Sequence, residues 1–505
     1  MSPSPTATDD LTFRRQFYLG PDFPDLLAGW TRHRVNERLG LSVHPDLTWT
    51  RADLGGRTLI LLGYALDPRR TDHDDQAIID EAIRQGTTLD RLISAFHPIA
   101  GRWAAIYVDH ERLVAFHDAT GSRQVFHCRD ADGTVHLGSS AGLLARITRR
   151  PKDTQALQQL EREGVFRAGF THFWPGSGSA FVGINRLLPN HHLDVVTGDV
   201  ERFWPCSPIP TMDPDEAAAL SISTLSGVIS AASTRHPLAL SLSAGFDSRL
   251  LLAAGRTIAT ELTYYSYKRQ GKNFLSPDVR LPQRICRDLG LRHKVIDARP
   301  QADGSLADAI AASVVPFHQP VVDQASALRR DPPRPDGRWV TVNGNVAEVA
   351  QRRLRRLPVT PENLARNARM TGSAFAMEHL SAWHSSSSQA FSAAGADPWD
   401  LLYWEHKMGG WYATIRTEFD VSEEVVTPYN SRAWLAAMLG VDPTLRSAPD
   451  WPFFRDLIGD LWPRLLDYPF NPPDRVDVVS KRARSLAKGV VTAGRSRKEN
   501  PEAPP

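Results

Sequence analysis

The residues with the clearest chemical potential lie between positions 243 and 248, where the sequence reads Ser-Ala-Gly-Phe-Asp-Ser. The apolar residues 238–242 before them predict a buried strand, and the apolar run after Ser248 has the length of a helix. The unpaired N–H groups and the dipole of a helix N-terminus attract an anion such as phosphate. Asp247 can hold a divalent cation against the same anion. We therefore predict an anion-binding loop, with an ordinary buried strand and turn as the alternative.

The elements around this loop alternate between strand and helix. Further strands are predicted at 261–267, 293–296 and 339–343, with helices from 248, over 276–290 and over about 304–314 between them. Strict alternation predicts an α/β fold with a doubly wound parallel sheet. Ligands bind at the carboxyl ends of the strands in such sheets, and both 243–248 and 343–348 fall there. From about 358 to 466 the signals are helical.

The first two hundred residues predict a domain of a different architecture. Strands at 58–66, 101–109 and 112–118 are joined by short turns, with a helical stretch at 75–96, which favours a sheet-rich α+β domain. A proline-rich linker at 205–214 then leads to a helix that ends near 232. The predicted organisation is residues 1–10 disordered, a domain over 11–207, a second domain over 208–480, and a basic flexible tail over 481–505.

The composition is that of an ordinary globular chain. It has 505 residues, 42% hydrophobic and 23% charged, with a formal net charge of +2, so no global field favours nucleic acid or a membrane surface. The N-terminus lacks the pattern of a signal peptide, and we expect no membrane span. Three widely spaced cysteines give neither a disulfide framework nor a zinc site, so a cytoplasmic location is expected.

The loop contains no lysine, so it differs from the phosphate loop that ends in Gly-Lys-Ser/Thr. It instead resembles the Ser-Gly-Gly-x-Asp-Ser pyrophosphate loop of asparagine synthetase-type enzymes, which activate a carboxylate as an acyl-adenylate. The N-terminal part is similar to the glutaminase-type domain of class B asparagine synthetases in a series of landmarks, at 101–106, 117–121, 125–127, 138–141, 184–189 and 203–204.

That family's glutaminase uses a cysteine directly after the initiator methionine, whereas this chain has Ser2 followed by Pro3. A serine hydroxyl could act as a nucleophile with the terminal amine as its base. A segment rich in proline and serine is a poor place to hold one, and we predict a glutaminase-like domain that does not hydrolyse glutamine.

The resemblance implies an ATP site with Mg²⁺. Asn343–Val349 resembles the family's Gly-Glu-Gly-Ala-Asp-Glu loop and places Glu348 at the second metal-binding acid beside Asp247. A helix-start acid is the alternative for Glu348. Tyr264, like its neighbour Tyr265, could flank adenine, although core packing explains a strand tyrosine equally simply. The predicted nucleotide-binding residues are Leu240, Ser241, Ser243, Ala244, Gly245, Phe246, Asp247, Ser248, Tyr264, Asp278 and Gly344.

Three residues are predicted to be catalytic. Lys407 and Lys481 are the candidates for the late lysine that, in this family, neutralises the charge of the developing acyl-adenylate. Glu405, beside His406, could deprotonate an incoming amine, while an exposed Glu-Lys helix face is the alternative. Four arginines between 352 and 356 predict a cationic face for phosphate or an acidic peptide, or a solvated surface.

The resemblance implies an ATP-dependent, AMP-forming carbon–nitrogen ligase that takes a peptide or a small carboxylate/amine substrate. Loss of the N-terminal cysteine is typical of β-lactam synthetases and lasso peptide cyclases, and Asn345 stands where β-lactam synthetases have a tyrosine. A lasso peptide cyclase, which joins a precursor's N-terminal amine to an Asp or Glu side chain, is therefore favoured. Its partners would be a leader-peptide-binding protein and a leader peptidase. A small-molecule amide or β-lactam synthetase, a glutamine-hydrolysing asparagine synthetase and an inactive peptide-binding homologue remain the alternatives.

Overall fold

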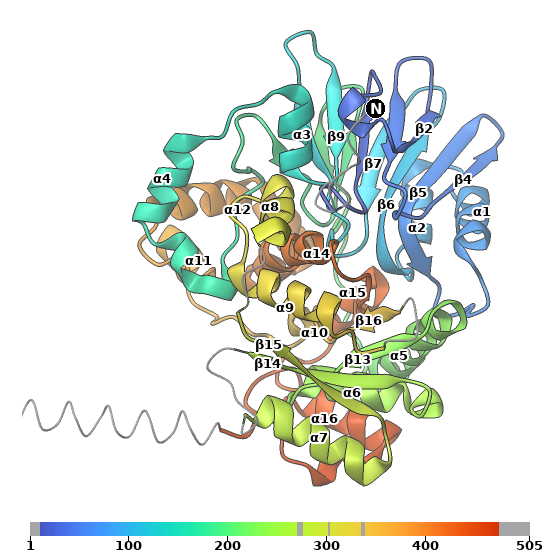
Figure 1. The fold of residues 1–505 in the computed structure, drawn as a ribbon, viewed down its shortest axis with the longest axis vertical. Helices are drawn as coiled ribbons and strands as arrows, with labels where there is room; N and C mark the ends of the chain where they lie inside the picture. The colour runs from blue at the N-terminus through green and yellow to red at the C-terminus, as the bar shows by residue number, and fades with distance from the viewer. Residues whose placement is uncertain (1–10, 270–275, 301–303, 335–338, 474–505) are drawn as a thin grey trace, which may run out of the picture.

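The computed structural model describes residues 11–269, 276–300, 304–334 and 339–473, and Figure 1 shows how their elements are arranged. The N-terminal part contains two antiparallel sheets of six strands, in the orders β10-β8-β9-β1-β3-β2 and β12-β11-β7-β6-β5-β4. The strands are β1 (Phe17–Gly20), β2 (Thr31–Arg34), β3 (Gly40–Val43), β4 (Trp49–Leu54), β5 (Arg57–Leu66), β6 (Ala100–Val108), β7 (Leu113–His117), β8 (Phe126–Arg129), β9 (Val135–Gly138), β10 (Asn185–Arg186), β11 (His191–Asp194) and β12 (Val200–Arg202).

Helices cover the outer faces of these sheets. Helix α1 (Asp75–Gln85) packs on β4 and β5 and against α2 (Leu89–Ala95), while α3 (Ala141–Thr148) packs on β8 and β9. Strand β5 shows the layering in its sequence: Ile60 and Leu62 belong to the core between the sheets, and Leu59 and Leu61 to the core under α1 and α2. A strand buried on both faces reads as a continuous apolar run. The expected sheet-rich α+β architecture is confirmed.

The second part contains the predicted parallel sheet. Its five strands have the order β15-β14-β13-β16-β17, and every neighbouring pair is parallel. The chain therefore begins this sheet at the central strand β13 and adds β14 and β15 on one side. It then crosses over and adds β16 and β17 on the other side of β13, so the strand order reverses between β13 and β16. The strands are β13 (Leu238–Ser241), β14 (Thr263–Arg269), β15 (His293–Ala298), β16 (Val340–Val342) and β17 (Val425–Val426).

Helices connect and flank these strands, as the alternating pattern predicted. The short strand β17 is the one strand of this sheet that the sequence did not indicate, because two residues carry too little pattern. The helices are α5 (Pro214–Arg235), α6 (Phe246–Ala254), α7 (Pro277–Leu289), α8 (Gly304–Ser313), α9 (Gln319–Arg330) and α10 (Ala347–Ala350).

Helix α5 is long and apolar enough to be a candidate membrane span by length and composition, contrary to the expectation that no such segment exists. Half of its most apolar window is buried inside the fold, and Leu225, Val228 and Ile229 are part of the main core. This burial is typical of a helix in a protein core. Such a helix can be as long and as apolar as a membrane span, so length and composition do not distinguish the two.

The remaining described chain is helical. A π-helical segment, η4 (Tyr403–Tyr412), joins α13 to α14. Such π-helical segments are uncommon and often lie at functional sites. The other elements are η1 (Asp25–Leu27), α4 (Thr154–Arg162), η2 (Val165–Thr171), η3 (Arg256–Ile258), α11 (Pro361–Asn367), α12 (Ala374–Ala394), α13 (Pro398–Leu402), α14 (Ala413–Phe419), α15 (Arg432–Gly440), α16 (Pro452–Leu461) and η5 (Pro463–Asp467).

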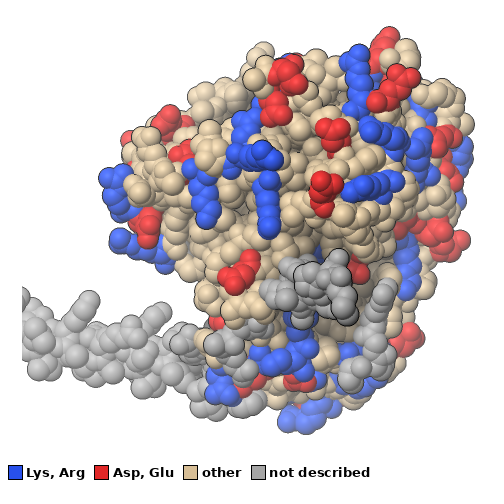
Figure 2. Space-filling view, turned by 45° about the horizontal axis from the view of Figure 1, so that its top comes forward, with Lys and Arg blue, Asp and Glu red and all other residues tan. Residues whose placement is uncertain are grey.

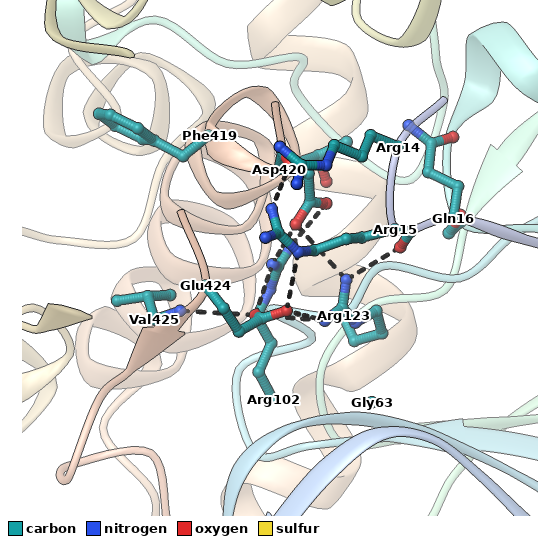
Figure 3. A network of polar contacts seen from close by, with 12 residues as sticks. Arg14, Arg15, Gln16, Gly63, Arg102, Arg123, Phe419, Asp420, Glu424 and Val425 are labelled. Atoms are coloured by element: carbon teal, nitrogen blue, oxygen red, sulfur yellow. Dashed lines mark hydrogen bonds and ion pairs between the residues drawn. The ribbon is translucent and has the colours of Figure 1, made fainter. Parts of the chain in front are cut away.

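A buried ion-pair network joins the two parts of the chain (Figure 3). Arg102 of β6 pairs with Asp420, at the end of α14, through contacts of 2.5 and 3.0 Å. Arg123 lies 3.2 Å from Glu424, and Arg15 lies 3.7 Å from it. Burial opposes ionisation of Glu424, but the guanidinium charges of Arg123, Arg102 and Arg15 outweigh it and lower the pKa of this carboxyl to about 2. The network holds the N-terminal sheets against the end of the parallel sheet.

Candidate functional site

Two loops meet at the point where the strand order of the parallel sheet reverses. One follows β13 and contains residues 243–248, and the other follows β16 and contains residues 343–348. Gly344 shows how closely they approach: a Cβ there would lie 2.9 Å from the Ser248 N and 3.0 Å from the Asp247 Cβ. Ligands in open α/β sheets bind in the crevice at such a reversal. The predicted loop pair is thus brought together by the fold.

The first loop leads directly into the N-terminus of α6. Gly245 is its N-cap and supplies no side-chain cap. The Ser248 Oγ accepts from the Ser243 N at 3.0 Å and lies 3.0 Å from the Ser243 Oγ, so the two serines fix the turn. The Ala244 N donates to the Asp278 Oδ1 at 3.3 Å, which places Asp278 beside this loop. The N–H groups of Ser243, Ala244 and Gly245 thus donate within the protein. The groups left for an anion are the N–H groups in the first turn of α6, because a helix N-terminus gives them no partner within the helix.

Two acidic side chains face the same place from the two loops. Glu348 lies in the first turn of α10, and its Oε2 is buried with no hydrogen-bond partner among the described residues. Burial and the Asp247 charge raise the pKa of Glu348 to about 7, so the two carboxyls repel each other. Burial likewise raises the pKa of Asp247, partly offset by Arg353 and Gln351.

The backbone just before Glu348 is strained. Val346 has φ 80° and is fully buried. A β-branched residue in this region is a genuine outlier, and such conformations collect at functional sites because the surrounding structure has to enforce them. The strain fixes where α10 begins and therefore where its first-turn acid lies.

Asp247 already has cationic and amide partners. Gln351 donates its side-chain amide to the Asp247 Oδ1, and Arg353 lies 3.7 Å from the Asp247 Oδ2. Arg353 also packs over the Trp451 ring at 4.4 Å. Tyr429 donates its hydroxyl to the Asp247 carbonyl oxygen at 2.8 Å. No local pattern in the sequence marks Gln351, Tyr429 or Trp451 as neighbours of Asp247 or Arg353, because these contacts form only in the folded chain.

The residues present fit a divalent cation in part. Two buried carboxyls of raised pKa, one of them with an unpaired oxygen, are the donor set that such a cation satisfies. Within the described chain no group of three or more His, Cys, Asp and Glu side chains is placed to hold a metal by protein ligands alone. A cation here would therefore draw further ligands from elsewhere, as Mg²⁺ does from phosphates and water.

Lys407 lies next to this pair of acids. Its Nζ donates to the Thr171 carbonyl oxygen at 2.9 Å and lies over the Phe173 and Trp411 rings. Burial lowers the pKa of Lys407 to about 7, with a further lowering from Arg369 and an opposing effect of Glu348. Lys407, Tyr403 and Glu348 line one cavity. The predicted lysine is thus in a position to act at this site.

Glu405 is placed differently. It is fully buried, and its carboxylate pairs with Arg202 at 2.5 and 2.8 Å and accepts from Trp383 at 2.8 Å. Asn190 donates to the same group at 3.1 Å. A carboxylate with all its oxygens engaged holds Arg202 and the N-terminal part in place, and this geometry gives it no free lone pair with which to deprotonate an amine. The alternative of an exposed Glu-Lys face is also wrong here, because the residue is inside.

The other predicted nucleotide residues divide into two groups. Tyr264 and Leu240 are fully buried in the sheet, and the Tyr264 hydroxyl donates to the Ala259 carbonyl oxygen, so Tyr264 follows the core-packing alternative. Ser241 instead lines a cavity of about 110 Å³ at the carboxyl ends of β13, β14 and β16, together with Tyr265, Asn343 and Tyr267. Lys481 lies outside the described residues.

No family model matches the sequence, and no curated protein sequence matches it. Among solved structures, the chain is similar to the glutamine phosphoribosylpyrophosphate amidotransferase from B. subtilis complexed with ADP and GMP, at 10% identity over 73% of this chain and 75% of that chain, with a TM-score of 0.24. It is similar to the allosteric regulatory enzyme of purine biosynthesis at 9% identity over 73% and 74%, also with a TM-score of 0.24. Both likenesses are distant, and neither says what this chain acts on.

Proposed function

We propose that this chain is an ATP-dependent carbon–nitrogen ligase that activates a carboxylate as an acyl-adenylate and releases AMP. The single observation that carries the proposal is the meeting of loops 243–248 and 343–348 at the strand-order reversal, with an acid from each. A helix N-terminus beside two buried carboxyls of raised pKa is suited to a polyphosphate and its cation.

The residues that would hold the nucleotide are the backbone and serines of the first loop, with the base next to Ser241 and Tyr265. Asp247 and Glu348 would hold Mg²⁺, which when bound neutralises phosphate charge. Arg353, the present cationic partner of Asp247 at 3.7 Å, occupies the neighbouring position and would move toward phosphate oxygens when the cation binds. Its guanidinium suits such oxygens, since it forms paired hydrogen bonds with them.

Lys407 supports the chemical step of this proposal. With a pKa near 7 it exists in both protonation states at neutral pH, so it can stabilise negative charge on an acyl-adenylate or accept a proton from an amine. Because Glu405 is engaged and Glu348 would hold the cation, the role of base falls to Lys407. Tyr403, in the same cavity, can orient the substrate carboxylate through its hydroxyl.

The finer proposal is macrolactam formation, in which a precursor peptide supplies both the Asp or Glu side chain and the N-terminal amine. It rests on the sequence resemblance and on Asn345, which stands where β-lactam synthetases have a tyrosine. A leader-peptide-binding protein and a leader peptidase would be the partners, in the cytoplasm. The second candidates are a small-molecule amide or β-lactam synthetase and a glutamine-using asparagine synthetase.

The test begins with the nucleotide, which requires no knowledge of the substrate. Purified full-length protein should bind a non-hydrolysable ATP analogue in the presence of Mg²⁺, measured by calorimetry, and binding should weaken when Mg²⁺ is chelated. Addition of acidic peptides should then release AMP and pyrophosphate. Failure to bind the analogue under any Mg²⁺ concentration would favour an inactive peptide-binding homologue. Release of ADP in place of AMP would contradict the acyl-adenylate.

A further inference from the structure

A cavity of about 660 Å³ lies beside Glu348, and five of the twelve residues that line it are basic. Its volume falls in the range of ordinary ligand sites. Phe173, from the N-terminal part, contributes one wall, so the cavity is bounded by both parts of the chain. Glu348 is the single acid in its lining, and the basic residues are Arg353, Arg355, Arg366, Arg369 and Lys407.

The arginines near this cavity differ in how they are paired. Arg352 and Arg356 point into the body of the protein, where both reach Asp397, at 3.5 and 2.8 Å. Arg355, Arg366 and Arg369 are exposed and form no ion pair within the described ranges. Hydrogen bonds, and after them the charge of Arg366, lower the pKa of the exposed Glu362. The chain thus pairs the arginines that face inward and leaves three positive charges at the cavity without a bound carboxylate. Three like charges held together repel one another unless an anion occupies the space between them.

The nucleotide does not account for this charge. No residue of the loop 243–248 lines the cavity, which reaches the acid pair only through Glu348 and Arg353. Polyphosphate held by that loop would leave Arg355, Arg366 and Arg369 unused. Guanidinium groups bind carboxylates in paired hydrogen bonds, and the apolar side chains of Leu354 and Leu402 can pack against the stem of a peptide side chain.

We propose that this cavity binds an acidic peptide segment, in which carboxylates other than the reacting one are held by Arg355, Arg366 and Arg369. The assignment of the reacting carboxylate to the end near Lys407 rests on the proposed ligase function, whereas the binding of the acidic segment does not. The three arginines would then determine specificity, by selecting substrates that carry additional acidic residues beside the activated one.

The experiment uses two fluorescein-labelled peptides, Gly-Glu-Gly-Glu-Gly-Glu and its counterpart with glutamine in place of every glutamate. Both peptides have an amidated C-terminus. Binding to the full-length protein is followed by fluorescence anisotropy. The glutamate peptide should bind at least about tenfold more tightly than the glutamine peptide, and binding should weaken at high salt. The double variant Arg366→Ala/Arg369→Ala should lose about tenfold in affinity for the glutamate peptide alone. Arg84→Ala/Arg91→Ala, two exposed arginines on α1 and α2, is the matched control and should change nothing.

A second arm separates carboxylates from phosphates. Affinities for pyrophosphate and for the Mg²⁺-bound ATP analogue should be unchanged in Arg366→Ala/Arg369→Ala. Equal binding of the two peptides, or a double variant that loses affinity for phosphates and keeps it for the glutamate peptide, overturns the proposal. If the wild-type protein selects the glutamate peptide and yet makes no AMP from ATP, the ligase function is wrong and the acidic-segment site stands.

Discussion

At the scale of single residues, substitution of Asp247 is the most direct test of the proposed chemistry. Asp247→Asn keeps the shape of the side chain and the amide contact with Gln351 but removes the charge. We expect AMP formation to fall about a hundredfold or more, because a metal clamp contributes several kcal/mol at about 1.4 kcal/mol per tenfold. Asp90→Asn, an exposed acid in the first turn of α2, is the control. An unchanged rate in Asp247→Asn with an unchanged melting temperature would remove this residue from the site.

Glu348 makes a prediction about pH. Burial and the Asp247 charge raise the pKa of Glu348 from 4.5 to about 7, so the protonated carboxyl stabilises the folded state at low pH. That contribution is lost as the pH rises from about 4.5 through about 7. Glu348→Gln lacks it, so the melting temperature of wild type relative to this variant should fall between pH 5 and pH 8. Mg²⁺ should recover part of the difference at pH 8 in the wild type only. If the melting temperatures of the wild type and the variant change in parallel across this pH range, the pKa of Glu348 is not raised in the folded protein.

At the scale of elements, the approach of the two loops depends on Gly344. In Gly344→Ala the added Cβ would lie 2.9 Å from the Ser248 N and 3.0 Å from the Asp247 Cβ, so the loops would have to separate. We expect a loss of stability of about 1 to 3 kcal/mol and a larger loss of affinity for the ATP analogue. Gly29→Ala, where a Cβ meets nothing within 4 Å, is the control. Analogue affinity that survives Gly344→Ala would show that the loops need not touch.

At the scale of the whole molecule, the buried network of Figure 3 couples the two parts. Asp420→Asn leaves Arg102 and Arg123 with Glu424 as their shared partner, and breaking a buried pair costs about 3 to 5 kcal/mol. The urea midpoint should fall accordingly. Asp46→Asn is the matched control, since its pair with Arg14 is at 2.7 Å but partly exposed, with side-chain exposures of 40% for Asp46 and 22% for Arg14. Solvent-exposed pairs contribute about 1 kcal/mol or less. Equal midpoints for the two variants would mean that the parts are held together by packing alone.

The chain as a whole carries little net charge. Figure 2 shows basic and acidic side chains interspersed on the face drawn, in agreement with a net charge of +2. The cluster of arginines at one cavity is therefore a local feature, and the net charge of the chain does not reveal it.

Glutamine provides the last prediction at this scale. The first strand of the N-terminal part begins at Phe17, and Ser2 lies outside the described residues. We expect that glutamine, added with ATP and substrate, yields no glutamate and leaves AMP formation unchanged. Removal of all residues before 208 should abolish activity, since it exposes the face that Arg102 and Arg123 cover. Glutamate released in proportion to AMP would contradict this prediction and would indicate an enzyme that transfers ammonia from glutamine.

Local patterns predict most of the elements around the proposed site. Residues 238–254 predict strand, turn and helix from local composition alone, and the alternation that follows specifies a parallel sheet, because hydrophobic periodicity and turn residues are local properties. The two-residue strand β17 carries no such pattern. Asp247 is located by its place in that turn, Glu348 by the resemblance of its loop to asparagine synthetase-type enzymes, and Lys407 only as one of two candidate lysines without a strong motif.

Which of these residues meet depends on how the chain folds. Glu405 and Lys407 are two positions apart in one helical segment, yet the first is enclosed by Arg202 and Trp383 and the second faces the cavity with Glu348. Arg352 and Arg355 differ in the same way, the first paired with Asp397 and the second exposed. Burial and pairing depend on segments hundreds of residues away, and no local pattern records them.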